Sequence, residues 1–427
     1  MVLLTLLLVV LAACSSAVST PLTTSEVQSE PETKQESATP LADESRPATL
    51  PPTKIPSPQV EQAEQAQQPQ EPVVIDLDAV PELDTSRHTV PLEEIIFDTF
   101  RRTNRAVPLP DADPDLILSL RDAIPPIYNP VFEGAGEANQ WLGSNDIILG
   151  YADGPEAFAY PVKILNWHEM VSHTVNGRYI LASYCPLCRS GVMYDRNVDG
   201  ETLTFGNTSA LHESDMVMFD HETGSYWMQV SGEAIAGTLA SQRMQALPSQ
   251  TTTWGAWKEQ HPQTQVLSRD TGHQRDYSRD PFTGLGEQYN ATGRFIFPVS
   301  PKGRDDRLDP GDVVLGVEGE GTQRAYALAA LGDGVINDRI GETPVVIFGS
   351  ADGPSGAAYM PVVEEQLLTF SFEAGEIHDQ QTGSTWNMAG QAIAGELAGS
   401  ELEPVASRST FWFSLIAAFP DLELYSK

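Results

Sequence analysis

The second half of the chain repeats the first with an offset of about 160 residues. The segment 145–154, NDIILGYADG, returns as GDVVLGVEGE from Gly311. Further on, ETGSYW from Glu222 returns as QTGSTW from Gln381. Because each copy has to form the same local structure, the repeat predicts two tandem units of one fold, packed as a pseudo-symmetric pair.

Short β-type runs fill each copy and predict a mainly β (α+β) fold with short helices. In the first copy these runs are DIILGYA, AFAYPVKIL, GRYILASY and GVMYDRNVDGETLTFG, and Gly, Asp or Asn residues bound them. The segment NVDGE between two alternating runs predicts a hairpin turn. We place the first β-rich copy, which holds a cysteine pair, at 145–300 and the second, cysteine-less copy at 301–427.

A helical lead-in and a strap precede the copies at 91–144. LEEIIFDTFRRT, from Leu92, and PDLILSLRDAI, from Pro114, have apolar residues at helical spacing and predict two helices. The strap is the proline-rich segment PPIYNPVF. Trp254 and Trp257 predict a further helix that packs on the first β unit.

The first 90 residues differ from the rest in composition. The apolar run MVLLTLLLVVLAACSS resembles the leader of bacterial lipoproteins, which is cleaved before a cysteine that becomes diacylated. The resemblance implies a signal at 1–14, lipidation of Cys14 and an extracytoplasmic, membrane-anchored protein; a short uncleaved anchor is the alternative. Residues 15–90 are rich in Pro, Gln and Glu, which predicts a disordered tether.

The net charge of the chain, −34, limits its partners. An acidic surface repels phosphate backbones, so nucleic acid is excluded as a partner. The expected partners are the membrane, through the lipid anchor, and a protein or small-molecule thiol or disulfide. Composition leaves the oligomeric state open.

Cys185 and Cys188, in YCPLCRSG, are the only cysteines after the leader. Because RYILASY precedes them and GVMYDR follows, we expect the pair in a tight turn between strands, stiffened by Pro186. Thiolate activation there needs turn amides, Arg189 or a nearby histidine. The spacing leaves open a redox-active dithiol, one side of a metal site, or a structural disulfide. A structural disulfide across so short a loop would contribute only about 2 kcal/mol through unfolded-state entropy.

The second copy lacks both thiols. When the copies are aligned, YCPLCRSG meets GSADGPSG at 349–356, so that Ser350 stands opposite Cys185. The second copy is also about six residues shorter between LTF and TGS, a span that in the first copy carries His212, Asp215, Met216, Met218 and His221. The joint loss predicts a site kept in the first copy only. The two methionines alternate as strand residues do, which favours core packing over a copper site.

His168, in NWHEMV, is predicted to transfer protons at the sulfur pair, and a histidine hydrogen-bonded under a loop is the alternative. On a helix His168 and Glu169 point apart, so only one of them can face the site. If the cysteines instead hold one zinc, iron or copper ion, the expected ligands are Cys185, Cys188, His168 and His212. Without such an ion we expect no cofactor.

From Asp122 to Tyr425 the sequence resembles the bacterial and archaeal family called domain of unknown function 3179. The resemblance rests on AYPVKILNWHEMV, SYCPLCRSGVMYDR, SDMVMFDHETGSYW, GVINDRIGETPVV and QTGSTWNMAGQAIAGEL. Some members are described as selenoproteins, which implies that a chalcogen in the cysteine pair is reactive. Ser214 and Asp215 match the family pattern, whereas His212 does not. Arg189 stands where the family more often has a small residue.

The sequence and the resemblance together predict thiol–disulfide redox activity, with one sulfur attacking an oxidised substrate and the other resolving the intermediate. Cys185 is the preferred attacking sulfur by analogy with other Cys-x-x-Cys proteins. Arg189, Ser214, Asp215 and His221 are the expected supporting residues. The prediction requires the sulfurs to lie where another molecule can touch them. Metal binding through the same cysteines and a non-catalytic surface scaffold with a structural disulfide are the alternatives.

Overall fold

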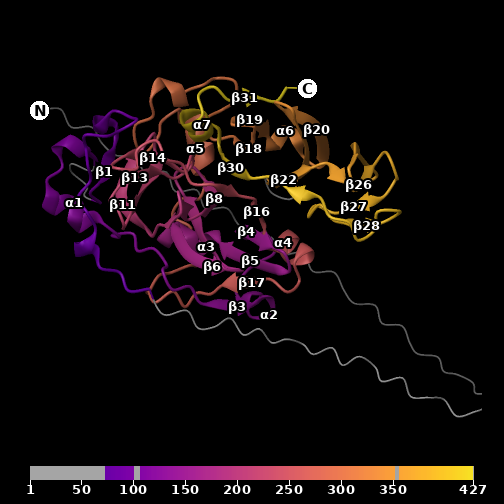
Figure 1. Ribbon diagram of the computed structural model, residues 1–427, viewed down its shortest axis with the longest axis horizontal. Coiled ribbons are helices and arrows are strands. Elements are labelled where there is room, and N and C mark those ends of the chain that lie inside the picture. Colours follow the sequence, from indigo (N-terminus) through magenta and orange to yellow (C-terminus); the bar gives the residue numbers. More distant parts are fainter. Residues whose placement is uncertain (1–72, 101–105, 352–354, 427) are drawn as a thin grey trace, which may run out of the picture. The chain divides into compact units, whose positions relative to one another are not determined.

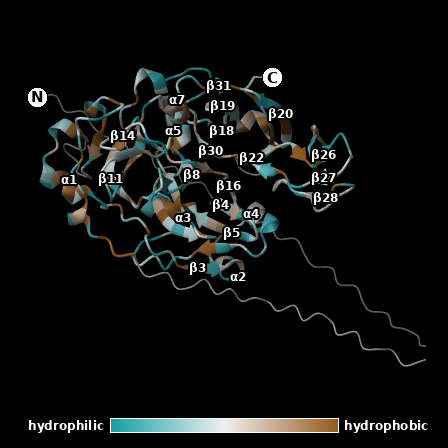
Figure 2. Cartoon of the chain, in the orientation of Figure 1, coloured by the Kyte–Doolittle hydropathy of each residue, from teal (hydrophilic) through white to brown (hydrophobic). Residues whose placement is uncertain are grey.

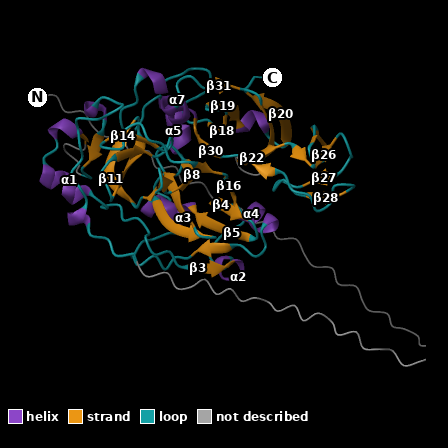
Figure 3. Cartoon of the chain, viewed as in Figure 1, coloured by secondary structure: helices purple, strands orange, loops and turns teal. Residues whose placement is uncertain are grey.

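Strands are the main regular structure of the described chain, and the helices are short (Figure 3). The computed structural model describes residues 73–100, 106–351 and 355–426. Within these residues the longest helix, α5 (Leu285–Thr292), has eight residues. The predicted mainly β fold is therefore confirmed. None of the helices in this part of the chain is long and apolar enough to span a membrane.

The two copies contain corresponding elements in the same order along the chain (Figure 1). The elements of the first copy are β4 (Ile147–Asp153), β5 (Glu156–Pro161), α3 (Val162–His168), β6 (Met170–Val175), β7 (Arg178–Cys185), β8 (Ser190–Asp195), β9 (Asn197–Val198), β10 (Glu201–Thr202), β11 (Phe205–His212), β12 (Asp215–Asp220), β13 (Tyr226–Met228), β14 (Glu233–Ala236), β15 (Ala246–Leu247), β16 (Gln250–Thr253), α4 (Trp254–Gln260) and β17 (Gln265–Leu267). Asn197–Val198 pairs with Glu201–Thr202, so the hairpin predicted at NVDGE is confirmed.

The second copy follows a connecting segment that contains α5 and η4 (Pro301–Gly303). Its elements are β18 (Val313–Gly319), β19 (Thr322–Ala327), α6 (Leu328–Leu331), β20 (Gly334–Ile340), β21 (Thr343–Ser350), β22 (Ser355–Met360), β23 (Val362–Val363), β24 (Gln366–Leu367), β25 (Phe370–Glu373), β26 (Glu376–Asp379), β27 (Thr385–Trp386), β28 (Ala392–Ala394), β29 (Glu403–Pro404), β30 (Ser407–Phe411), α7 (Trp412–Ala418) and β31 (Glu423–Leu424).

Strand pairing also recurs between the copies. The neighbours β16-β4-β5-β17 correspond to β30-β18-β19-β31, and the chain β11-β12-β13-β14 corresponds to β25-β26-β27-β28. The three-stranded run β6-β7-β8, with β15 paired to β8, corresponds to β20-β21-β22 with β29. The order of elements and their pairing thus occur twice. An arrangement of the copies about a symmetry axis stays a prediction.

A strand from each copy meets a strand of the other. Gly191 in β8 pairs with Ser409 in β30, which joins β6 to β8 and β18, β19, β30 and β31 in one sheet (Figure 1). Gln250 in β16 donates a hydrogen bond to the hydroxyl oxygen of Tyr359 in β22 over 3.0 Å. The turn that holds the two cysteines therefore lies next to the second copy.

The lead-in is less helical than its spacing predicts. Leu92–Glu94 is a single 3-10 turn, η2, and strand β1 (Ile96–Asp98) follows it. The prediction of a helix from Leu92 is therefore wrong at these residues, because Ile96 and Phe97 pair with β11 and extend its sheet. The remaining elements before the first copy are η1 (Leu77–Ala79), β2 (Ala106–Pro108), η3 (Leu109–Asp111), α1 (Pro114–Leu120), β3 (Phe132–Gly134) and α2 (Ala135–Ala138).

Of the other local predictions, the helix from Pro114 is confirmed as α1, where the Asp113 side chain accepts a hydrogen bond from the Leu116 amide. The helix at Trp254 and Trp257 is confirmed as α4, which buries both rings. The tether prediction is wrong for 73–90. Val80 packs in an apolar cluster with Phe219, and Thr89 donates a backbone hydrogen bond to Ile235. Residues 15–72 and Cys14 lie outside the described residues.

Hydrophobic and hydrophilic residues are mixed along the strands and along the connections between them (Figure 2). The cluster behind β7 and β8 contains Cys185 and Cys188 together with Met216, Met218 and Trp227. Core packing of the two methionines, which the sequence favours, is therefore confirmed. The same cluster draws residues from α5 and from the second copy, so the cysteines lie at the meeting point of three segments of the chain.

Gly232 lies between β13 and β14, where this hairpin packs closely on β8. Its φ is +69°, and a Cβ there would lie 2.6 Å from the Tyr194 ring. Gly177, between β6 and β7, has a φ of +79° with no atom within 4 Å of such a Cβ. Alanine at either position carries a left-handed cost of about 1 kcal/mol. We expect Gly232→Ala to lower the free energy of unfolding by about 2 kcal/mol more than Gly177→Ala.

Chemical denaturation of the two variants and the parent measures this difference. Equal losses of stability in the two variants would contradict the close packing of Gly232 against Tyr194.

Candidate functional site

The cysteines occupy a tight turn between two strands, as the sequence predicts. Cys185 is the last residue of β7 and pairs with Ser190, the first residue of β8. Cys188 lies between them, and Arg189 after it has a φ of +51°. This left-handed conformation favours glycine and costs a larger residue roughly 1 kcal/mol. It gives a physical reason why a small residue is expected at the position of Arg189.

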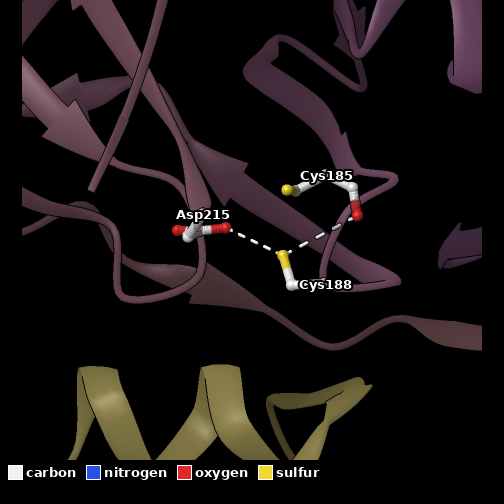
Figure 4. Close-up of side chains that lie close together, drawn as sticks. All are labelled: Cys185, Cys188 and Asp215. Atoms are coloured by element: carbon white, nitrogen blue, oxygen red, sulfur yellow. Dashed lines mark hydrogen bonds between the residues drawn. The ribbon is translucent and has the colours of Figure 1, made fainter. Parts of the chain in front are cut away.

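Cys188 forms the closest polar contact of the site. Its thiol donates a hydrogen bond to Asp215 Oδ1, with 2.9 Å between sulfur and oxygen (Figure 4). The carbonyl oxygen of Cys185 lies 3.7 Å from the same sulfur. The backbone amide of Val230 donates to Asp215 Oδ2 over 2.9 Å and so holds the carboxylate in place. One donor atom each of Cys185, Cys188 and Asp215 lies within 4.8 Å of the others.

The span between LTF and TGS, which is shorter in the second copy, delivers Asp215 to the sulfur. Strands β11 and β12 have eight and six residues, whereas their counterparts β25 and β26 have four each. The longer hairpin turns at Glu213 and Ser214, which have φ values of +53° and +59°, and Asp215 follows directly. In the second copy Ser350 ends β21 as Cys185 ends β7. Sulfur and hairpin extension therefore form one site.

Both sulfurs are buried. The exposed fractions of Cys185 and Cys188 are 1% and 0%, and that of Asp215 is 0%. Thr410 Oγ1 and the Phe411 amide of the second copy donate hydrogen bonds of 3.0 and 2.9 Å to the Cys188 carbonyl. The expectation that the sulfurs lie where another molecule can touch them is wrong in this structure, because the second copy and α5 cover the turn.

Burial raises the pKa of both thiols. For Cys185, the side chain and the backbone amide of Cys188 act in the opposite direction. For Cys188, the hydrogen bond to Cys185 and the charge of Asp215 add to burial, and the pKa lies well above its usual value. Burial also raises the pKa of Asp215 to about 6. Cys185 is therefore the more readily ionised sulfur, and Asp215 is a base of near-neutral strength.

Glu169, and not His168, lies near enough to the sulfurs for its charge to act on Cys185. Glu169 caps α3 with a φ of +59°, and its Oε2 accepts a hydrogen bond of 2.5 Å from Asn207 Nδ2. Burial and the neighbouring Asp215 raise the pKa of Glu169 to about 8, and its charge raises the pKa of Cys185. The prediction that one of the two residues faces the site holds, but the choice of His168 needs correction.

His168 belongs to a separate hydrogen-bond network. Its Nδ1 lies 2.8 Å from the Pro125 carbonyl oxygen, and its Nε2 lies 2.7 Å from the Tyr277 hydroxyl. The imidazole is fully buried, and burial lowers its pKa to about 4. These bonds agree with the alternative interpretation, in which His168 is a hydrogen-bonded histidine under a loop. Neither bond involves a sulfur atom.

The other expected site residues divide between the centre and its surroundings. Ser214 lies in the hairpin turn next to Asp215, and Arg189 closes the cysteine turn. His221 stacks on Phe219 and lies 3.1 Å from the Tyr128 hydroxyl. His212 groups with Glu94 and Glu213 and not with the cysteines. The metal ligand set predicted from sequence, with His168 and His212, is therefore not assembled, and the carboxylate beside the two cysteines is that of Asp215.

Residues 121–422 match the family described as protein of unknown function (DUF3179). The chain belongs to this family. No curated protein matches the chain, and no solved structure matches it either.

The candidate site of this chain includes two further residues that the sequence did not indicate. Asn207 Nδ2, besides binding Glu169, lies 3.5 Å from the sulfur of Met216. Tyr289 of α5 is fully buried, and the neighbouring Cys185 and Cys188 add to the effect of burial in raising its pKa. Asn207 lies in the hairpin that the second copy shortens, which is a usable signal. Tyr289 lies in the connecting segment and has no such signal.

A pocket of 440 Å³ lies beside the cysteine turn of this DUF3179 protein. The turn contributes Tyr184, Pro186 and Arg189 to its wall, and the segment 280–287 contributes the opposite side. Neither sulfur lines the pocket. A molecule in it would therefore be separated from Cys185 by the turn and by the first residues of α5.

Glu169 makes the stability of the metal-free protein dependent on pH. Its pKa is 4.5 in the unfolded chain and about 8 in the folded protein, so the folded state binds the proton more tightly. Between these values the contribution of Glu169 to stability falls as pH rises. We expect the free energy of unfolding of Glu169→Gln to rise relative to that of the parent by about 1.4 kcal/mol for each pH unit in this window.

Denaturant titrations of parent and variant at several values between pH 5 and 8 measure the gain. Glu93→Gln, which changes an exposed glutamate, is the control. A constant difference between Glu169→Gln and the parent across the window would contradict the raised pKa.

Proposed function

We propose that the first copy carries a thiol–disulfide redox centre, in which Cys185 attacks the substrate, Cys188 resolves the intermediate and Asp215 accepts the proton of Cys188. The observation that carries the proposal is the hydrogen bond of 2.9 Å from the Cys188 thiol to Asp215. A thiol becomes a nucleophile by losing its proton, and a buried thiol needs a base in direct contact to do so. Asp215, with a pKa of about 6, is ionised at neutral pH and can accept it.

The order of the two sulfurs follows from their environments. The backbone amide of Cys188 donates to Cys185 and stabilises its thiolate, whereas the hydrogen bond to Cys185 and the charge of Asp215 add to burial in raising the pKa of Cys188. Cys185 is therefore the better attacking sulfur. Cys188, in contact with the base, is suited to the second step.

The reaction balances for a disulfide substrate. Cys185 Sγ forms a bond to one substrate sulfur, the substrate disulfide breaks, and the other sulfur leaves with the Cys185 proton as a thiol. Cys188 then transfers its proton to Asp215 and attacks Cys185 Sγ. The bond between Cys185 and the substrate breaks, and the second thiol leaves with the proton from Asp215. The dithiol is oxidised to a disulfide, and the substrate is reduced to two thiols.

The burial of the sulfurs restricts the substrate class. A folded protein partner cannot approach sulfurs with exposed fractions of 0 and 1% beneath the second copy. A small disulfide needs only a displacement of the segment around α5, next to the pocket of 440 Å³. We therefore expect small-molecule disulfides to react faster than protein disulfides.

Asp215→Asn tests the role of the carboxylate, because it keeps the shape of the side chain and removes its basicity. With a small aromatic disulfide at pH 7, we expect release of the second thiol to slow by about 100-fold, the lower range for loss of a general base. The mixed disulfide on Cys185 should then accumulate, as measured by mass spectrometry. Attack by Cys185 should not slow, since loss of the nearby carboxylate lowers its pKa.

Asp220→Asn is the matched control. It removes a buried carboxylate at the other end of β12, where Asp220 accepts a hydrogen bond from Trp227. Resolution at the parental rate in Asp215→Asn, or equal slowing in both variants, would refute the proposed role of Asp215.

A metal centre is the second candidate, and one observation favours it. Cys185, Cys188 and Asp215 place two sulfurs and an oxygen within 4.8 Å, and all three are buried. A divalent zinc, iron or copper ion would compensate the buried acidic groups, including Glu169, and requires the thiols deprotonated. Metal analysis of protein purified under reducing conditions separates the candidates. One ion per chain that is lost in Cys188→Ser would favour the metal centre over the dithiol.

A further inference from the structure

The hairpin that carries Asp215 holds a second group of ligand-type residues directly before it. His212 ends β11, Glu213 occupies the turn, and Glu94 of η2 meets them from the lead-in. One ring nitrogen or carboxylate oxygen of each lies within 4.8 Å of the other two. His212 and Glu213 are buried, with exposed fractions of 6 and 8%, whereas Glu94 is exposed and leaves the group open to solvent.

His212 offers a free donor atom to this group. Its Nδ1 is buried and has no hydrogen-bond partner among the described residues. The backbone carbonyl of Glu94 accepts a hydrogen bond from the ring. An imidazole that donates from one nitrogen presents the other as a metal ligand, and such a carbonyl fixes its orientation. A buried nitrogen without any partner costs about 1–3 kcal/mol, which a bound ion would remove.

The two carboxylates suit a cation in their position and in their charge. The amide of Ser300 donates to Glu213 Oε2 over 2.7 Å and leaves the other oxygen of Glu213 for a ligand. Glu94 and Glu213 together carry two negative charges next to a neutral imidazole. The charge of Lys302 also acts on His212, in the direction opposite to the two carboxylates.

We propose that Glu94, His212 and Glu213 bind a divalent transition-metal ion of the zinc class. One imidazole and two carboxylates form a three-ligand zinc set with a fourth position for water. The nitrogen donor favours zinc over calcium and magnesium, which take oxygen ligands. The site is independent of the proposed redox function, since it shares no residue with the cysteine centre.

The ion would connect the lead-in to the hairpin. Glu94 precedes β1, and β1 pairs with β11 through Ile96 and Leu211. Asp215 begins β12 one residue after Ser214, so a bridge across Glu94, His212 and Glu213 fixes the turn from which Asp215 extends. Occupation of the site would therefore stabilise the hairpin on which the cysteine centre depends.

Zinc binding to a Cys185→Ser/Cys188→Ser double variant tests the proposal, because the thiols can no longer hold the ion. After removal of metal with a chelator, calorimetry with zinc chloride at pH 7.5 should give one ion per chain. Adding Glu94→Gln should weaken binding at least tenfold, whereas Glu93→Gln, its exposed neighbour, should not change it. His212→Asn should also weaken binding at least tenfold.

If the double cysteine variant does not fold, Glu94→Gln and Glu93→Gln are made in the parental protein instead. Glu94→Gln should then bind one zinc fewer per chain than Glu93→Gln, and zinc should raise the Tm of Glu93→Gln by more. Equal zinc content and equal Tm shifts in the two variants would overturn the site. Neither result bears on thiol exchange at Cys185.

Discussion

The backbone carbonyl of Cys188 joins the two copies by hydrogen bonds at the turn that carries the sulfurs. The Phe411 amide and Thr410 Oγ1 of the second copy donate to it over 2.9 and 3.0 Å. Without these donors a buried carbonyl would lack partners, at a cost of about 1–3 kcal/mol. The cysteine-less copy is therefore part of the cysteine site, because it completes and covers the turn that carries the sulfurs.

The same coverage sets the chemistry of the centre. Two thiols and the carboxyl groups of Asp215 and Glu169 share a buried region, and burial raises the pKa of each. Protons are therefore retained until a base, a substrate or a cation removes them. A redox dithiol and a metal centre both make use of this property. In the redox dithiol Asp215 accepts one proton, whereas in the metal centre the bound ion displaces several protons.

Local sequence patterns predicted the parts of the fold that short segments decide. The turn between β7 and β8, the NVDGE hairpin and the strands around them follow from residue preferences over a few positions. The pattern was misleading at Leu92 and at 73–90. There, pairing with β11 and contacts with distant apolar residues decide the structure, and helical spacing or polar composition does not encode those contacts.

The sequence by itself determined that the site belongs to the first copy, because both the cysteines and the longer β11–β12 hairpin are missing from the second. The tertiary structure alone decided which polar residues reach the sulfurs. His168 and Glu169 are adjacent in sequence, but the left-handed backbone of Glu169 and its bond to Asn207 turn the carboxyl group inward. The tertiary structure also decided that the sulfurs are buried, because Tyr289 and Phe411, which pack on them, lie far along the chain.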